Sequence, residues 1–280
     1  MIHLGLIGYP LDHSLSPRLH NAAFHTCGLQ GDYSLFPVEP DNRPGLKEIL
    51  ARVRSGEIHG LNVTIPHKQN VIPFLDELTH SAKAIGAVNT TYFSEKKLIG
   101  DNTDAGGFRS DLKRILTRQT RRHEELKALV LGAGGGARAV IYVLLKDGWD
   151  VTVAARRIEQ AEQLATSFKQ NDFQITNYEL SKIDLSNFSL VVNTTPLGMT
   201  PKIDQSPWPE QLTFPPHAVI YDLVYNPRET KLVRDAGLQG RPATTGLGML
   251  IEQAALSFEI WTGHRPSREA MFQAVNHTAL

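Results

Sequence analysis

The chain has 280 residues, 41% of them hydrophobic, which is enough for one large or two modest domains with their own cores. Its 29 Lys and Arg residues balance 29 Asp and Glu residues, so no net charge favours nucleic acid or an anionic membrane as a partner. The single cysteine, Cys27, excludes an intrachain disulfide and a thiolate-rich zinc site, and the scattered histidines lack metal-ligand spacing. We therefore expect no metal site and no nucleic-acid or membrane partner.

Short apolar strands alternate with helical patterns through the first hundred residues. The first residues, 2–7, form a strand pattern and not a cationic segment followed by an apolar secretory core, and no apolar run reaches membrane-spanning length. Further strands are predicted at 33–38 and 60–65, and helices from Ser16, at 42–53 and at 76–85. This alternation predicts an α/β layer with mostly parallel strands. We expect the protein to be cytoplasmic.

Two hydroxyl side chains, Ser14 and Ser16, lie where the first predicted helix begins. Ser16 is expected to cap that helix, with Pro17 in its first turn. Capping does not account for Ser14, which could bind a hydroxylated or carboxylated ligand.

Polar side chains also follow the strand at 60–65. Asn62 and Thr64 face the same side of that strand because side chains alternate, and Lys68 comes just after it. Asn89 and Asp104 could converge with them at the strand ends, where ligands bind in open α/β sheets. The alternative for Lys68 is an ordinary exposed surface charge.

A second unit begins near Gly106 with a helical stripe that includes Phe108 and Leu112. The basic cluster after it (Arg118, Arg121, Arg122 and His123) is interpreted as a solvated helix end or linker. Apolar runs predict strands at 128–131, 151–155, 190–193 and 219–224, with a helix at 158–168. Residues 195–216, with six prolines, are expected to form a long loop, and the helical tail at 249–261 to fold back onto the first domain.

A glycine-rich loop, Gly132-Ala133-Gly134-Gly135-Gly136-Ala137, directly follows the strand that ends at residue 131. An apolar helix comes next and ends at Gly148, so residues 127–155 have the size of one βαβ crossover. The N-terminus of such a helix offers free N–H groups and a partial positive charge to a pyrophosphate. We predict dinucleotide binding in preference to a structural glycine turn.

The strand after this helix ends in Ala155-Arg156-Arg157, with no acidic residue. NAD-preferring sites usually place Asp or Glu there, and a carboxylate would repel a 2′-phosphate. Guanidinium groups bind phosphate bidentately, so the predicted cofactor is NADP; the alternative is two exposed arginines that open the next helix. A lysine steered by a carboxylate can move a proton while a bound nicotinamide moves a hydride, which suggests an alcohol–ketone oxidoreductase.

Taken in order, these motifs resemble the shikimate dehydrogenase family over nearly the whole chain. The matching segments are 14–17, 62–68, 86–90, 100–107, 132–137, 193–199, 221–227 and 246–255. Any one of them could arise by chance, whereas the ordered set hardly could. The resemblance implies NADPH-dependent reduction of 3-dehydroshikimate to shikimate, in the pathway to chorismate and the aromatic amino acids.

The resemblance also implies roles for individual residues. Lys68 and Asp104 would be the catalytic pair. The residues expected to bind substrate are Ser14, Ser16, Asn62, Thr64, Lys68, Asn89, Asp104, Tyr225 and Gln253. Those expected to bind NADP are Gly132, Ala133, Gly134, Gly135, Gly136, Ala155, Arg156, Arg157, Asn193, Thr194, Leu223, Gly246 and Met249.

The predicted organisation follows from these assignments. An N-terminal α/β domain for substrate and catalysis would span residues 1–104, and a Rossmann-like, doubly wound NADP domain residues 105–246. A C-terminal helical segment, residues 247–280, would pack on the first domain. Two other functions stay open: a quinate/shikimate dehydrogenase that uses NAD, and a dinucleotide-binding regulator without catalysis. Either a monomer or a homodimer is compatible with the sequence.

Overall fold

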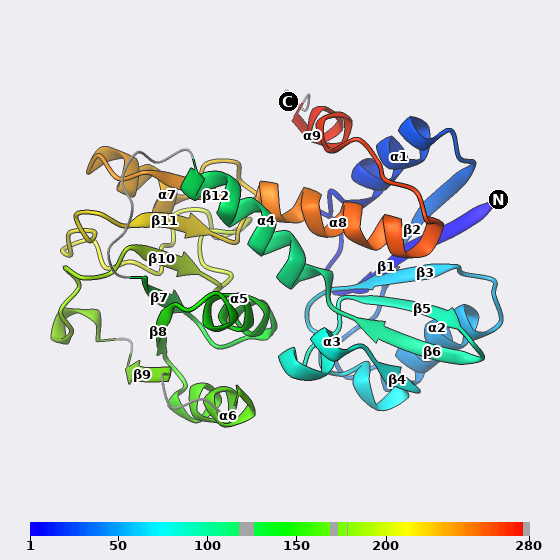
Figure 1. The fold of residues 1–280 in the computed structure, drawn as a ribbon, viewed down its shortest axis with the longest axis horizontal. Coiled ribbons are helices and arrows are strands. Elements are labelled where there is room, and N and C mark those ends of the chain that lie inside the picture. Colours follow the sequence, from blue (N-terminus) through cyan, green and yellow to red (C-terminus); the bar gives the residue numbers. More distant parts are fainter. Residues whose placement is uncertain (118–125, 169–172, 178, 277–280) are drawn as a thin grey trace. The chain divides into compact units, whose positions relative to one another are not determined.

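The chain folds into two compact α/β units, each with its own six-stranded sheet (Figure 1). The computed structural model describes residues 1–117, 126–168, 173–177 and 179–276; the basic cluster from Arg118 to His123 lies outside them. The first unit joins Met1–Ser110 to Leu250–Leu280, and the second is Asp111–Met249. This confirms the predicted fold class, including the return of the C-terminal helix to the first domain.

The first unit has a mixed sheet with the strand order β2-β1-β3-β5-β6-β4. Its strands are β1 (Ile2–Gly8), β2 (Gly31–Pro37), β3 (Gly60–Val63), β4 (Glu77–Leu78), β5 (Thr90–Ser94) and β6 (Lys97–Asp101). Its helices are α1 (Ser16–Cys27), α2 (Arg43–Arg54), the 3-10 turn η1 (Ile72–Phe74) and α3 (His80–Ile85). β1 pairs in parallel with β2 and β3, while β5 runs antiparallel to both β3 and β6.

One predicted helix of this unit is wrong in its start, and one hairpin was not predicted. The helix expected at 76–85 begins only at His80, because Thr79 caps it by accepting a hydrogen bond from the Ala82 N–H. Glu77 and Leu78 instead pair with β6. The β5–β6 hairpin, with its antiparallel pairing, was not predicted at all.

The second unit has an all-parallel sheet with the strand order β12-β11-β10-β7-β8-β9. Its strands are β7 (Lys127–Leu131), β8 (Asp150–Ala155), β9 (Phe173–Asn177), β10 (Leu190–Asn193), β11 (Val219–Asp222) and β12 (Ala243–Thr245). Its helices are α5 (Gly135–Lys146), α6 (Ile158–Phe168), the 3-10 turn η2 (Leu180–Lys182) and α7 (Lys231–Leu238). Two longer helices, α4 (Thr103–Thr117) and α8 (Leu247–Thr262), each contribute residues to both units.

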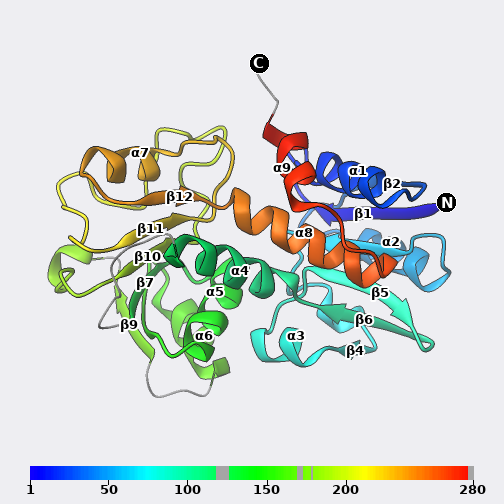
Figure 2. The same ribbon diagram turned by 45° about the horizontal axis from the view of Figure 1, so that its top comes forward.

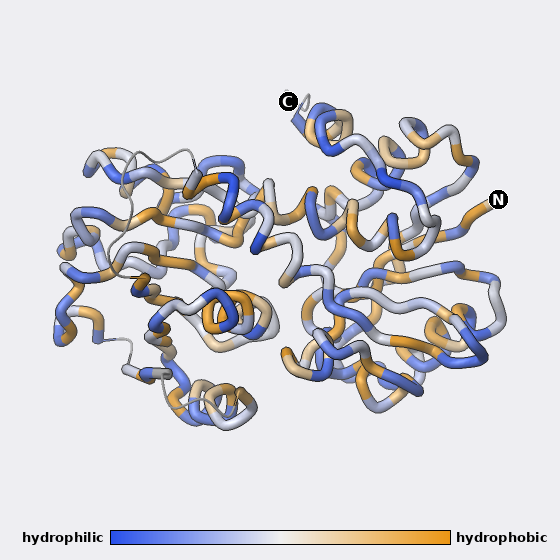
Figure 3. The backbone as a smooth tube through the Cα atoms, viewed as in Figure 1, coloured by the Kyte–Doolittle hydropathy of each residue, from blue (hydrophilic) through white to orange (hydrophobic). Residues whose placement is uncertain are grey.

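The chain order reverses between β7 and β10, as in a doubly wound sheet, and ligands bind at such a switch point beyond the carboxyl ends of the strands. All four residues of β10 and of β11 are buried, as expected for strands covered on both faces. Helix α5 packs against β7 and β8, and the hydrophobic colour in Figure 3 follows these elements. The core of this unit therefore fixes the strand ends that matter for ligand binding.

The C-terminal helices pack on the first unit. Helix α9 (Arg268–Asn276) lies beside α1 (Figure 2), where the Arg18 guanidinium donates to the Ala274 carbonyl oxygen at 2.5 Å. In α8, the Trp261 indole donates to the Thr91 carbonyl oxygen of β5 at 3.1 Å. In the part of the chain that is described, no helix combines the length and apolar character needed to cross a membrane.

Candidate active site and cofactor site

An ion pair between Lys68 and Asp104 lies at the centre of the polar cluster in the first unit. Lys68 follows β3, and its carbonyl oxygen is held by the Val88 N–H at 2.7 Å. Its ammonium donates to Asp104 Oδ2 at 2.6 Å, and the two side chains are 17% and 7% exposed. An ammonium carries three donors, and Asp104 is its only hydrogen-bond acceptor among the described residues. Two donors thus stay available to a ligand.

Helix α4 presents the carboxylate of this pair. Asn102 caps the helix, since its Oδ1 accepts from the Ala105 N–H at 3.2 Å and its amide donates to the Ala87 carbonyl oxygen at 2.9 Å. Asp104 lies in the first turn, where a negative charge is stabilised by the helix dipole. The sequence therefore fixes the position of Asp104 locally, through its own cap.

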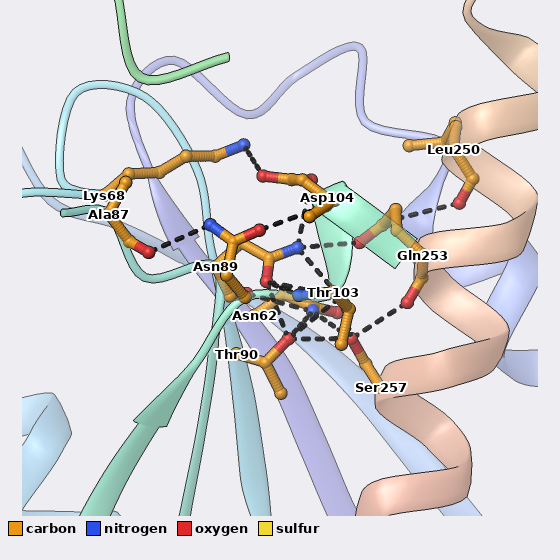
Figure 4. Close-up of polar contacts among 12 residues, drawn as sticks. Asn62, Lys68, Ala87, Asn89, Thr90, Thr103, Asp104, Leu250, Gln253 and Ser257 are labelled. Atoms are coloured by element: carbon orange, nitrogen blue, oxygen red, sulfur yellow. Dashed lines mark hydrogen bonds and ion pairs between the residues drawn. The ribbon is translucent and has the colours of Figure 1, made fainter. Parts of the chain in front are cut away.

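Asn89 connects the ion pair to the C-terminal helix α8 (Figure 4). Its amide nitrogen lies 3.0 Å from Asp104 Oδ1, 3.2 Å from Gln253 Oε1 and 2.9 Å from Thr103 Oγ1. Its own oxygen accepts from the Thr103 N–H at 2.7 Å. Lys68, Asn89, Asp104 and Gln253, which were singled out in four separate segments, therefore form one cluster.

Asn62 lies deeper and is engaged by protein groups. Its oxygen accepts from the Tyr33 hydroxyl at 2.8 Å, and its amide donates to the Asn89 carbonyl oxygen at 3.1 Å and to Ser257 Oγ at 2.9 Å. Thr64, just beyond the end of β3, is half-buried. Asn62 thus ties the strand to α8 in the observed arrangement.

Ser14 and Ser16 lie together at the start of α1. The predicted capping by Ser16 is wrong: Ser16 is the first helical residue, Leu15 takes the cap position without a side-chain hydrogen bond, and the Ser16 N–H donates to Ser14 Oγ at 3.3 Å. Because Ser14 accepts from the backbone, the Ser16 hydroxyl is not needed for the cap. Two hydroxyls at a helix N-terminus suit a carboxylate ligand.

Four residues of the polar cluster were missed. Thr90, Thr103, Ser257 and Tyr33 are joined to it by hydrogen bonds, with Ser257 Oγ 2.8 Å from Thr90 Oγ1 and 2.9 Å from Thr103 Oγ1. Ser257 lies four residues after Gln253, on the same helix face, and this spacing could have identified it. Nothing in the sequence around Tyr33 marks it.

The glycine loop of the second unit fits a pyrophosphate. Gly132 has a φ of +107°, and a Cβ there would lie 2.7 Å from Thr194 Oγ1, so only glycine is accommodated. Gly134 caps α5 without a side chain, and a Cβ added there would meet no atom within 4 Å. Free space therefore lies beside the first turn of α5, whose N–H groups lack intrahelical partners.

The other predicted cofactor residues surround this loop or lie at neighbouring strand ends. A Cβ on Gly136 would be 3.5 Å from Leu223 Cδ2, and Gly246 packs against the Leu223 backbone. Thr194, after β10, donates to the Leu131 carbonyl oxygen at 2.7 Å. Ala133, Asn193 and Met249 are buried, and Tyr225 is half-buried.

The end of β8 carries two positive charges. Ala155, its last residue, is buried, whereas Arg156 and Arg157 are both exposed. Their guanidinium groups are thus accessible to a phosphate at the position where an NAD site would carry a carboxylate.

Comparisons with known proteins agree along the chain. Residues 6–91 match the model of the shikimate dehydrogenase substrate-binding domain, residues 114–228 the shikimate/quinate 5-dehydrogenase model, and residues 246–275 the shikimate 5′-dehydrogenase C-terminal domain. A shikimate dehydrogenase (NADP⁺) from Salinibacter ruber is 42% identical, with 96% of this chain and 95% of that protein covered.

Two solved structures are similar throughout. Shikimate 5-dehydrogenase from Thermus thermophilus, in complex with NADP(H) and shikimate, superposes with a TM-score of 0.85 at 36% identity, and both chains are covered completely. Shikimate dehydrogenase from Aquifex aeolicus has a TM-score of 0.87 at 35% identity, with 98% of this chain and 97% of that chain covered.

Proposed function

This chain belongs to the shikimate dehydrogenase family, and on that premise we propose that it catalyses the reversible NADPH-dependent reduction of 3-dehydroshikimate to shikimate. The observation that carries the proposal is the Lys68–Asp104 ion pair, in which the ammonium keeps two donors for a ligand. Such a reaction would serve the synthesis of chorismate and the aromatic amino acids.

Lys68 is the acid in this proposal. As the substrate carbonyl is reduced, negative charge develops on its oxygen, and the Lys68 ammonium stabilises that charge and delivers a proton to the oxygen. In the reverse direction the neutral amine removes the hydroxyl proton. Asp104 orients the ammonium from 2.6 Å.

The substrate is held by the rest of the polar cluster. Asn89 and Gln253, with Asn62, Thr64 and Asp104, would bind the ring hydroxyls. Ser14 and Ser16 at the start of α1 would bind the carboxylate. Tyr225, a residue of the second unit, stays a prediction of the family resemblance.

The cofactor site has two ends. Gly132 to Gly136 and the first turn of α5 would hold the pyrophosphate, and the segment from Ala155 to Arg157 the 2′-phosphate. The nicotinamide end would be lined by Asn193, Thr194, Leu223, Gly246 and Met249. When bound, NADPH supplies the hydride. The residues present fit this group, because the glycine loop leaves space where a Cβ would otherwise project.

The functional division of the chain is part of the proposal: residues 1–104 for substrate and catalysis, 105–246 for NADP, and 247–280 as the helical segment returning to the first domain. We also assign the protein to the cytoplasm, as a monomer or a homodimer. Sedimentation of the purified protein would decide between the two states.

One absorbance assay tests the function. The protein is mixed with shikimate and NADP⁺, and the absorbance of reduced nicotinamide is followed. A rise that requires both compounds supports the proposal, and its absence would refute it. The same assay with quinate and with NAD⁺ measures specificity: faster turnover of quinate with NAD⁺ would establish the broader dehydrogenase instead.

A further inference from the structure

Three buried polar residues form a chain of hydrogen bonds behind the cofactor loop. Asn193 and Asp222 are the last residues of the neighbouring strands β10 and β11, where they stand side by side in the register, and Thr230 precedes α7. All three are 0% exposed. The proposed reaction mechanism gives Asp222 no task.

The directions of these hydrogen bonds match an ionised carboxylate. Asp222 Oδ1 accepts from the Asn193 amide at 2.8 Å and from the Val224 N–H at 3.0 Å, and Oδ2 accepts from the Thr230 hydroxyl at 2.6 Å. Thr230 Oγ1 in turn accepts from the Val233 N–H as the cap of α7, so its proton is directed to Asp222. Protonation at Oδ2 would reverse the bond to Thr230, whose hydroxyl would then accept, and would remove the charge that strengthens the two hydrogen bonds at Oδ1.

The same carboxylate fixes two segments that flank the glycine loop. Asp222 binds the amide nitrogen of Asn193 and so turns the Asn193 oxygen towards Thr195. This oxygen accepts hydrogen bonds from the Thr195 N–H at 2.8 Å and from the Thr195 hydroxyl at 2.7 Å. On the other side, the bond to the Val224 N–H fixes the turn that carries Leu223. Thr194 borders Gly132 and Leu223 borders Gly136, so both segments face the loop.

We infer that Asp222 is a positioning residue for the nicotinamide end of the cofactor site, acting in its ionised form through Asn193 and the Val224 N–H. This inference rests on the proposed function, because it takes the glycine loop as the pyrophosphate site. It predicts that removal of the charge weakens binding of the whole dinucleotide but not of the same molecule without its nicotinamide.

The inference makes cofactor binding depend on pH. Burial, only partly offset by the three donors, raises the pKa of Asp222 to about 6. The groups that face it from β10, β12 and α7 are neutral: Asn193, Thr245 and Thr230. Of the charged residues beside Thr230, Lys231 is paired with Asp235 and Glu210, and Arg228 and Glu229 are exposed. The bonds from Asn193 and the Val224 N–H should therefore weaken as the pH falls through about 6, because the carboxyl loses its charge.

The test measures binding to the full-length protein by calorimetry, without substrate. Two ligands are compared from pH 5 to 8, NADP⁺ and 2′-phospho-ADP-ribose, which lacks only the nicotinamide. Both carry the same pyrophosphate and the same 2′-phosphate, which itself titrates near a pKa of about 6, so the ratio of their affinities cancels that effect. Asp222→Asn should weaken NADP⁺ binding about tenfold at pH 8, the equivalent of one charged hydrogen bond, with binding of 2′-phospho-ADP-ribose unchanged.

Matched variants separate positioning from simple damage. In the wild type the affinity ratio should fall as the pH drops through about 6. Thr230→Val removes a donor and should move this midpoint to higher pH, whereas Thr230→Ser keeps the hydroxyl and should leave it in place. Asp111→Asn changes another buried carboxylate of the same unit, bound by the Tyr221 hydroxyl, and should leave the ratio unaltered.

Two outcomes would overturn the inference. Equal weakening of both ligands by Asp222→Asn would mean general damage to the unit, and unchanged binding of both would mean that Asp222 has no role. Failure of the wild type to bind NADP⁺ would instead reject the proposed function, and the inference with it.

Discussion

At the residue scale, the two oxygens of Asp104 have different tasks. One accepts from the Lys68 ammonium and the other from the Asn89 amide, so the carboxylate is held on both sides while the ammonium keeps donors for a ligand. The pair is mostly removed from water, and loss of one member leaves the other with an uncompensated charge.

Replacement of Lys68 by alanine should lower kcat about 10²–10⁴-fold, the usual contribution of a general acid, with a small change in the KM for shikimate. Steady-state kinetics measures both constants. Lys47→Ala, at an exposed lysine on α2, is the control and should have wild-type kinetics. Normal turnover in the Lys68 variant would remove this residue from the mechanism.

Asp222 should also make the free energy of unfolding depend on pH. Its pKa is raised from 3.8 to about 6, so the folded state holds the proton more tightly than the unfolded state. The resulting stabilisation is fully present below the unfolded pKa and is lost as the pH rises through about 6. Between pH 4 and pH 7, the free energy of unfolding of Asp222→Asn should therefore gain about 2 kcal/mol relative to the wild type. Urea unfolding of both proteins at the two pH values measures this; a constant difference would contradict it.

The sequence predicted some residues of the polar cluster because they occur in short motifs. Asn89 and Asp104 each stand in such a motif, and the structure brings them together. Ser16 failed as a cap because backbone geometry, with Leu15 at the cap position, outweighs residue preference at a helix start. Tyr33 could not be found, since its role depends on the side chain of Asn62 on β3, which is separated from β2 by β1 in the sheet.

At the element scale, the first turn of α4 presents Thr103 and Asp104, and Asn102 fixes where the helix begins. The Asn102 amide also satisfies the buried carbonyl oxygen of Ala87. Asn102 therefore fixes both the start of α4 and the position of Asp104 in the site.

Asn102→Ala should lower the free energy of unfolding by about 1–3 kcal/mol, through loss of the cap and an unsatisfied carbonyl, and should lower kcat as well. The control is Asn42→Ala, which removes the exposed cap of α2, where the Gly45 N–H is bound at 2.9 Å. Asn42→Ala should lower the free energy of unfolding by about 1 kcal/mol and leave kcat and KM unchanged. Unfolding and kinetics are measured on both; equal kinetic effects would refute a special role for Asn102.

Gly134 should be needed for the cofactor and not for folding. A methyl group there meets no protein atom within 4 Å, so Gly134→Ala should change the free energy of unfolding by less than about 1 kcal/mol. It would project into the proposed pyrophosphate space and weaken NADP⁺ binding about tenfold or more. Gly148→Ala is the opposite case. Because Gly148 has a φ of +82°, this change should lower the free energy of unfolding by about 1–2 kcal/mol and leave the affinity for NADP⁺ unchanged. Calorimetry and urea unfolding separate the two; loss of stability without loss of affinity in the Gly134 variant would contradict the assignment.

Helices and strands could be predicted where the apolar periodicity and the glycine positions indicated the same boundaries, as in the βαβ crossover around Gly132. The β5–β6 hairpin escaped because its turn is Glu95-Lys96, which adopts positive φ values of 50° and 62° without the Gly or Asn that usually marks such a turn. Two-residue β4 is too short for any pattern.

At the scale of the whole molecule, the first unit is built from two distant parts of the chain. Helix α8, from the second of these parts, supplies Gln253 and Ser257 to the polar cluster and the Trp261 hydrogen bond to β5. The strands of the second unit, in contrast, all come from one continuous segment.

A chain that ends after Met249 should therefore lose shikimate binding and retain NADP⁺ binding. Removal of α8 exposes the buried core of the first unit and takes away two residues of its polar cluster. A chain that ends after Gly263 keeps α8 and lacks α9. It should still bind shikimate, and its free energy of unfolding should be lower than that of the full chain. Calorimetry with each ligand checks both; shikimate binding by the shorter chain would disprove the dependence on α8.

The division of the first unit between the two ends of the chain sets an order for biosynthesis. A ribosome that has released residues 1–249 has made everything the second unit requires, while the first still waits for its last helices. The pocket that should receive shikimate is consequently completed later than the second unit, and a product of termination before α8 lacks it.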